Sequence, residues 1–199
     1  MRKGQRMEGR IVARSGIWIA VAIMAAVLQA PAARADEISQ ILRGYEIITE
    51  IFPKGTKLNF AGKDWALVGL GSYLVNSTGC NDCHTHPNWA TNHNPYLGQP
   101  KQINTAVYLS GGRQFLKSDG TVLTTSANIT PDKMTGRPAG LTLAGFLEVM
   151  QTGHDPKDGD ILLVMPWPLY QWKTDRDLTA MYEYLRVIPP LPANSNPGP

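Results

Sequence analysis

The chain has 199 residues, of which 43% are hydrophobic, with a formal net charge of +3 and two cysteines. Six of its 19 lysines and arginines, but only one of its 16 acidic residues, precede residue 36, so the remainder holds 13 basic and 15 acidic side chains and a net charge of −2. This balance leaves no positive stripe of the kind that binds nucleic acid, and we expect no nucleic-acid partner. A chain of this length can bury a core without disulfides, and two cysteines separated by two residues do not form a disulfide framework.

The first 35 residues have the three-part pattern of a secretory signal. Five basic residues before position 15 precede an uncharged apolar run over residues 17–28, and Ala33-Arg34-Ala35 offers small residues at the cleavage positions. The alternative, an uncleaved membrane anchor, would need about 20 apolar residues, and this run is shorter. We therefore expect residues 1–35 to be a cleaved signal peptide and the mature protein to be periplasmic or otherwise exported.

Two helices are predicted after this leader. The first covers residues 38–52, where apolar side chains repeat at three- and four-residue steps until Pro53 ends the run. The second covers residues 63–76. It contains Gly69 and Gly71, which weaken a helix unless another element must approach closely. The apolar positions are Ile38, Ile41, Leu42, Tyr45 and Ile48 in the first helix, and Ala66, Leu70, Tyr73 and Leu74 in the second.

Two further helices are predicted near the C-terminus. One covers residues 142–151, with Thr142 as its N-cap and Gly153 as its end. The other follows Thr174, a capping residue, and ends before Pro189-Pro190. Its apolar face consists of Leu178, Met181, Tyr182 and Leu185, and we expect Gly69 and Gly71 to permit a close crossing against this face.

Residues 85–141 are rich in Asn, Gly, Pro and Thr and show little periodicity. An irregular stretch of this length in a compact domain usually wraps a ligand or carries a function. We expect the tryptophans at positions 65, 89, 167 and 172 to be core residues or to line a bound group.

Cys80-Asn81-Asp82-Cys83-His84 is the most informative segment, because a C-x-x-C-H run is the attachment signature for c-type haem. One turn of chain lets both sulfurs reach one edge of the porphyrin, and the next residue places an imidazole beneath the iron. Histidine is a good axial ligand because its neutral nitrogen is a strong donor near pH 7. The segment predicts one haem c, attached through Cys80 and Cys83 and ligated by His84.

Two other interpretations of these cysteines stay open from the residues alone. A zinc site could combine the two cysteines with His84, His86 and His93. A thiol redox pair is the other possibility, although it is typical of a strand followed by a helix, and this motif follows a predicted helix.

The sixth ligand of such an iron has several candidates. Met134, Met150, Met165, Met181 and His154 lie downstream, and His86 and His93 lie close to the attachment run. Met150 and Met181 fall on apolar helix faces, where methionine usually fills the core. Met165 precedes Pro166 in a rigid, non-helical segment, which suits a ligand that must be held in place. We expect Met165 to be the ligand.

The order of motifs resembles a class I cytochrome c. Over residues 63–190 it is similar to a single haem domain of the cytochrome c subunits of membrane-bound alcohol and sugar-acid dehydrogenases. The segments that carry the resemblance are Gly69-Leu70-Gly71-Ser72-Tyr73-Leu74, Gly79 through Thr85, Gly111-Gly112-Arg113, Ala127-Asn128-Ile129-Thr130-Pro131-Asp132, Met165-Pro166 and the helix from Thr174 to Arg186 with Pro189-Pro190.

The resemblance implies an all-α fold, a small helical domain wrapped around one covalent haem, with long irregular loops and an additional N-terminal helix. It also implies that Met165 is the sixth ligand and that Asn128, Thr130 and Pro131 line the haem pocket. We accordingly expect a signal peptide over residues 1–35, an N-terminal helix and linker over 36–62, a cytochrome domain over 63–190 and a flexible tail over 191–199.

Iron ligated by both His84 and Met165 has no open position, which favours outer-sphere electron transfer over catalysis. We therefore expect an electron-transfer protein and not an enzyme. We also expect a monomer that is at most peripherally associated with a membrane. Its partner would be a redox protein, on the dehydrogenase or the terminal-oxidase side, and it could be the haem subunit of a dehydrogenase complex. The alternative is an enzyme or ligand sensor in which Met165 is displaced.

Overall fold

The computed structural model describes residues 34–156 and 158–195. The predicted signal peptide lies almost entirely outside the described residues. The chain divides into two units between Ser39 and Gln40. Of the first unit, residues 34–39 are described and are helical; all that follows concerns the second.

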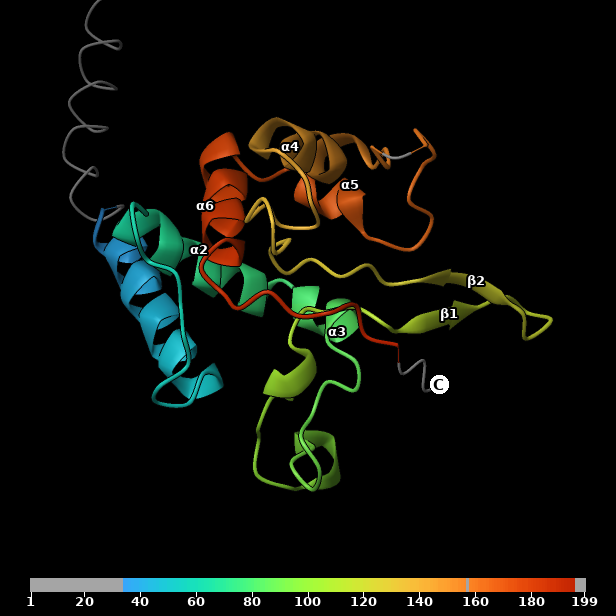
Figure 1. The fold of residues 1–199 in the computed structure, drawn as a ribbon, viewed down its shortest axis with the longest axis horizontal. Helices are drawn as coiled ribbons and strands as arrows, with labels where there is room; N and C mark the ends of the chain where they lie inside the picture. Colours follow the sequence, from blue (N-terminus) through green and yellow to red (C-terminus); the bar gives the residue numbers. More distant parts are fainter. Residues whose placement is uncertain (1–33, 157, 196–199) are drawn as a thin grey trace, which may run out of the picture. The chain divides into compact units, whose positions relative to one another are not determined.

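Helices are the main elements of the second unit, as the sequence predicts (Figure 1). The first helix runs to residue 51. The others are α2 (Trp65–Ser77), α3 (Cys80–His84), α4 (Leu143–Thr152), α5 (Trp167–Tyr170) and α6 (Asp175–Leu185), with short 3-10 turns η1 (Pro95–Leu97) and η2 (Thr105–Val107) and strands β1 (Gln114–Leu116) and β2 (Val122–Thr125).

The core is built where α2 crosses α6 (Figure 1). A Cβ atom on Gly71 would lie 1.9 Å from the carbonyl oxygen of Ala180 and 2.8 Å from the Cβ atom of Tyr184, so the two helices could not approach this closely with any larger residue. The apolar face predicted for the last helix, Leu178, Met181, Tyr182 and Leu185, is buried here. The close crossing at Gly71 is confirmed.

Gly69 faces a different helix, and the prediction that it also contacts the last helix is wrong. A Cβ atom on Gly69 would lie 2.7 Å from the carbonyl oxygen of Ile41, in the first helix. Ser72, which is fully buried, donates a hydrogen bond of 2.8 Å to the carbonyl oxygen of Gly44. Since neighbouring glycines on a helix point to different sides, α2 packs against the first helix through Gly69 and against α6 through Gly71.

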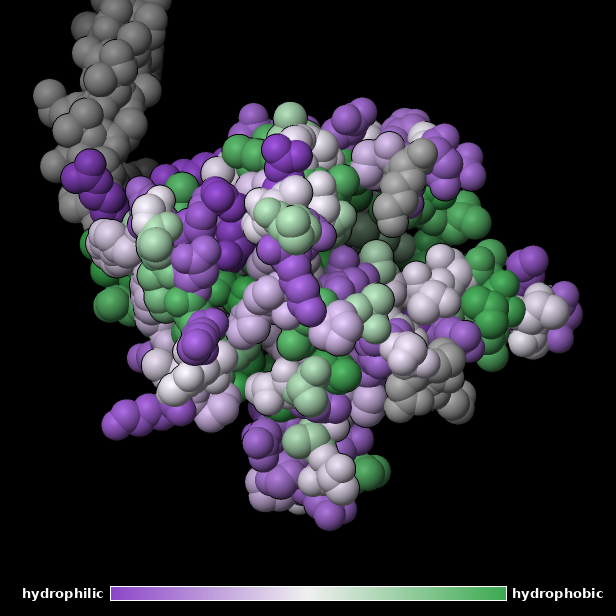
Figure 2. Space-filling model, in the orientation of Figure 1, coloured by the Kyte–Doolittle hydropathy of each residue, from purple (hydrophilic) through white to green (hydrophobic). Residues whose placement is uncertain are grey.

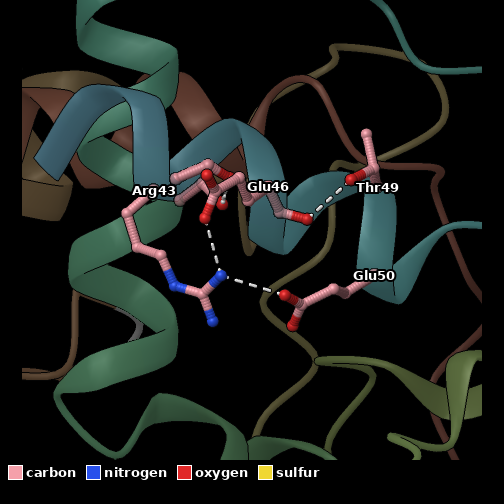
Figure 3. Close-up of polar contacts among 6 residues, drawn as sticks. Arg43, Glu46, Thr49 and Glu50 are labelled. Carbon is pink, nitrogen blue, oxygen red and sulfur yellow. Dashed lines mark hydrogen bonds and ion pairs between the residues drawn. The ribbon is translucent and has the colours of Figure 1, made fainter. Parts of the chain in front are cut away.

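The first helix buries Ile41 and Ile48, whereas Leu42, predicted to share their face, is 57% exposed. On its surface, the Arg43 guanidinium binds the carboxylates of Glu46 and Glu50 at 2.8 and 3.0 Å (Figure 3). These exposed pairs raise the pKa of Arg43 through hydrogen bonds to Glu46 and then Glu50. Because such pairs are solvated and screened by salt, burial of the isoleucines stabilises this helix far more.

The ends of α4 and α6 follow the predicted capping residues. The Thr142 side chain accepts a hydrogen bond from the backbone nitrogen of Gly145, and Gly153 ends α4 with a φ of 74°. Thr174 and Asp177 form a reciprocal capping box at the start of α6. Both ends of α4 and the start of α6 therefore lie within about one residue of their predicted positions.

The long irregular stretch contains a two-stranded antiparallel sheet that the sequence analysis did not predict. Leu116, Val122 and Leu123 on this β1–β2 hairpin are exposed. Figure 2 shows the corresponding hydrophobic surface over the hairpin. A lone two-stranded hairpin buries little, so its side chains lack the alternating burial by which strands are usually recognised.

Candidate haem-attachment site

Both cysteines and His84 lie on a single helical turn, α3, which follows α2 almost without interruption. Gly79 makes this possible, because its left-handed φ of 88° redirects the chain between the two helices. The side-chain nitrogen of Asn81 donates a hydrogen bond of 2.6 Å to the side-chain oxygen of Asn76, which ties the turn to the end of α2. The two cysteines are not bonded to each other.

The surroundings of the sulfurs disfavour thiolate chemistry. Burial raises the pKa of Cys80, and burial also raises the pKa of Cys83, against the opposing charge of Arg113. Cysteines of a reactive thiol redox pair instead have lowered pKa values, because the thiolate is the nucleophile. The raised pKa values therefore disfavour a reactive thiol pair and leave both sulfurs uncharged near pH 7.

Tyr170 in α5 connects a distant part of the chain to the attachment turn. Its hydroxyl donates a 2.8 Å hydrogen bond to the carbonyl oxygen of Thr78 and lies 3.8 Å from the sulfur of Cys80. Burial, followed by the neighbouring Cys80, raises the pKa of Tyr170, so it remains a neutral donor. Nothing in the sequence analysis singled out this residue.

The orientation of the His84 ring is fixed by one hydrogen bond. Its Nδ1 atom lies 2.7 Å from the carbonyl oxygen of Ala127. A carbonyl oxygen can only accept, so Nδ1 carries the hydrogen and Nε2 keeps its lone pair. Burial lowers the pKa of His84, against the bond to Ala127. The imidazole is therefore neutral near pH 7 and presents Nε2, the state that an iron ligand requires.

Gly111 lets the backbone around Ala127 lie close to His84. The backbone nitrogen of Gly111 donates a 2.7 Å hydrogen bond to the carbonyl oxygen of His84. A Cβ atom on Gly111 would lie 2.7 Å from the carbonyl oxygen of Ala127, and its φ of 77° favours glycine. This glycine lets the segment around residue 127 lie directly against the attachment turn. The Arg113 side chain also donates to the carbonyl oxygen of Asp82, in the same turn.

The predicted pocket residues Asn128, Thr130 and Pro131 directly follow Ala127. Thr130 and Pro131 are buried, and Asn128 is partly buried. The polar atoms of Asn128 and Thr130 bond to each other and to the backbone of Leu191. Leu191 and Asn194, in the predicted tail, are thus hydrogen-bonded to the rest of the chain. The role of these three residues toward haem stays a prediction.

Met165 is partly buried and packs against the core, directly before α5. Its carbonyl oxygen accepts a 2.8 Å hydrogen bond from the backbone nitrogen of Trp167. Since Tyr170 at the end of α5 touches Cys80, the segment after Met165 lies beside the attachment turn. The ligand role of Met165 also stays a prediction.

Two of the other methionines lie in the core, as predicted, and a third is on the surface. Met150 and Met181 are buried in the core, and Met134 is 92% exposed. Trp65 and Trp172 are 61% and 83% exposed, so neither is a core residue, and the expectation that tryptophans line a bound group stays a prediction. Trp65 is the first residue of α2, and Trp172 lies in the turn after α5.

A small pocket of about 120 Å³ lies between Phe52, Tyr108 and Leu191, and it contains none of the predicted haem residues. Among the described residues, no group of three or more His, Cys, Asp or Glu side chains could hold a metal ion. Within residues 34–156 and 158–195, no helix has both the length and the apolar character needed to cross a membrane.

Comparison with known proteins identifies two similar cytochromes. The chain is 33% identical over 134 residues to the gluconate 2-dehydrogenase cytochrome c subunit of Pantoea cypripedii, covering 66% of this chain and 26% of that protein. It is 26% identical over 150 residues to the cytochrome c subunit of alcohol dehydrogenase (quinone) of Gluconobacter oxydans, covering 74% of this chain and 27% of that one. No family model matches the chain, and no solved structure does.

The chain thus spans about a quarter of the length of the curated relatives it matches. Both relatives are cytochrome c subunits of dehydrogenases, which is the group that the order of motifs resembles. The resemblance is confirmed: this chain is similar to part of the cytochrome c subunits of dehydrogenases.

Proposed function

We propose that this protein is an exported c-type cytochrome with one haem, which carries single electrons between redox partners. The observation that carries the proposal is the geometry of α3, where two uncharged sulfurs and a neutral imidazole of fixed tautomer share one turn. Haem c would supply an iron that accepts and releases one electron. The two similar cytochrome c subunits support the same chemistry.

Each residue of the site would have a separate task. Cys80 and Cys83 would hold the haem through thioether bonds, and His84 would bind the iron through Nε2. Met165 would be a second iron ligand, in a segment that Tyr170 connects to the attachment turn. A thioether ligand favours ferrous iron, so the reduction potential should exceed that of an iron with two histidine ligands. Asn128, Thr130 and Pro131 would lie along the pocket.

The location and the partner belong to the same proposal. The basic and apolar pattern of residues 1–35 supports a cleaved signal and export to the periplasm. We assign the haem domain to residues 63–190, with an N-terminal helix and linker over 36–62 and a tail over 191–199. The partner would be a redox protein. A dehydrogenase is favoured, because both relatives are named as dehydrogenase subunits. The protein itself would be a monomer and a carrier of electrons, not an enzyme.

The attachment can be tested by replacing both sulfurs. A Cys80→Ala/Cys83→Ala variant, expressed with a cytochrome c maturation system, should lose all covalently bound haem, because no sulfur remains to form a thioether. Haem staining of a denaturing gel measures this. The matched control is Asp82→Ala, which removes an exposed side chain from the same turn and should keep the stain. Staining of the double variant at the wild-type level would refute the proposal.

A further inference from the structure

We infer that Asn128 and Thr130 are positioning residues that hold the Ala127 carbonyl against His84 and thereby set the reduction potential of the haem. Together with Leu191, they form a cluster that we call the proximal clamp. The inference rests on the proposed function, because it requires His84 to bind iron.

Asn128 uses both ends of its side chain to fix the backbone directly after Ala127. Its Oδ1 atom accepts hydrogen bonds from the backbone nitrogen and the hydroxyl of Thr130, at 2.9 and 2.8 Å. Its Nδ2 atom donates a 2.9 Å hydrogen bond to the carbonyl oxygen of Leu191. The side-chain amide thus closes the turn over residues 128–130 and attaches it to a chain segment 63 residues away.

Thr130 provides the second bond between the same two segments. Its side chain is buried, with 2% of the residue exposed. Its hydroxyl oxygen accepts a 3.1 Å hydrogen bond from the backbone nitrogen of Leu191. Leu191 is therefore held through both its nitrogen and its carbonyl oxygen, so the contact fixes orientation as well as position.

The backbone around the Ala127 carbonyl is restrained from the other side too. The backbone nitrogen of Ile129 donates a 2.9 Å hydrogen bond to the carbonyl oxygen of Leu109. Gly111 packs directly against Ala127, with no room for a Cβ atom. The Ala127 carbonyl that contacts His84 therefore lies between the proximal clamp and the backbone of residues 109–111. Of these two restraints, the clamp is formed by side chains and can be tested by substitution.

The clamp matters for electron transfer because the hydrogen bond to Nδ1 changes how strongly Nε2 donates. A short, well-aligned bond makes the imidazole a more basic ligand, which stabilises ferric iron. If the Ala127 carbonyl can turn away, the bond lengthens and donation weakens. Ferric iron then loses stabilisation, and the reduction potential becomes more positive.

The test compares midpoint potentials of holoproteins. Asn128→Ala and Thr130→Val each remove clamp bonds, and both should raise the potential. The expected change in the ferrous-to-ferric ratio at a fixed applied potential is about threefold to tenfold, the range that one ordinary hydrogen bond covers. Thr130→Ser restores the hydroxyl and should return the potential to the wild-type value.

Asn94→Ala is the matched control, because the Asn94 side chain accepts from the backbone nitrogen of Tyr96 in the same type of turn, at η1. It should leave the potential unchanged. If the Asn128→Ala protein does not acquire haem, the comparison of midpoint potentials between Thr130→Val and Thr130→Ser tests the inference by itself. Variants that bind haem and unfold more easily, but keep the wild-type potential, would overturn the inference and make the clamp a stability device. A wild-type protein without covalent haem would instead overturn the proposed function.

Discussion

The residues of the candidate site contact groups that are near them in sequence and groups that are far away in sequence. Cys80, Cys83 and His84 are neighbours in sequence and share one turn. The group that orients His84 is a backbone carbonyl 43 residues away, and the hydroxyl that contacts Cys80 is 90 residues away. The three candidate attachment residues are therefore brought together by local sequence, whereas the groups that contact them are brought there by the tertiary fold.

Met165 is the residue whose role most needs a direct experiment. Met165→Ala should open the sixth coordination position, so the reduced protein should gain rapid carbon monoxide binding at neutral pH and lose its low-spin spectrum. Difference spectra of the reduced protein with and without carbon monoxide measure this. Met134→Ala is the control, since Met134 is 92% exposed, and it should behave like the wild type.

Two results would contradict this assignment. A Met165→Ala protein that keeps a six-coordinate, low-spin spectrum would show that another side chain is the ligand. Rapid carbon monoxide binding by the wild type would favour the alternative of an enzyme or ligand sensor over that of a carrier.

Sequence patterns single out Cys80, Cys83 and His84 as candidate attachment residues, because their spacing is itself the signature, and the structure places all three on one turn. They could not identify Ala127, since its contribution is a backbone carbonyl, which every residue has. Tyr170 was missed for a related reason: its position near Cys80 follows from how α5 packs and not from any spacing. The Gly111-Gly112 pair was the one available signal, because adjacent glycines often mark a close approach of two backbones.

The helices position the site through two glycines that face opposite neighbours. Gly71 meets α6 and Gly69 meets the first helix, so α2 lies between them and carries α3 at its end. Helix periodicity and capping residues predict α2, α4 and α6 well, because both signals are local. The β1–β2 hairpin was missed although Asp119-Gly120 between two apolar pairs is a typical hairpin signal.

The α2–α6 crossing gives a quantitative prediction. Gly71→Ala places a methyl group 1.9 Å from the Ala180 carbonyl oxygen and should lower the free energy of unfolding by about 1–3 kcal/mol. Gly145→Ala in α4 is the control, because the nearest atom to its Cβ would be the hydroxyl oxygen of the N-cap residue Thr142, 3.5 Å away. It should be neutral or stabilise by up to about 1 kcal/mol, as alanine favours a helix.

Urea denaturation of the two variants measures both effects. Equal free energies of unfolding for Gly71→Ala and the wild type would mean that the two helices can separate without cost. The close crossing would then not be what holds α2, and with it α3, in place.

At the level of the whole molecule, the arrangement joins three distant segments around one turn. The backbone between Gly111 and Thr130 contacts His84, and α5 contacts Cys80. Leu191 forms a hydrogen bond to Thr130 and so attaches the C-terminal segment to the first of these two segments. Covalent attachment, as proposed, would keep the haem bound to a small domain with long loops even where free haem is scarce. The similarity covers about a quarter of each of two larger cytochrome c subunits, so the comparison concerns one part of those proteins.

The mass of the protein, purified from a cell that matures c-type cytochromes, tests the central claim most directly. The account predicts the mass of the processed polypeptide plus one haem, retained under denaturing conditions, because two thioether bonds survive unfolding. A mass equal to that of the polypeptide alone would contradict it.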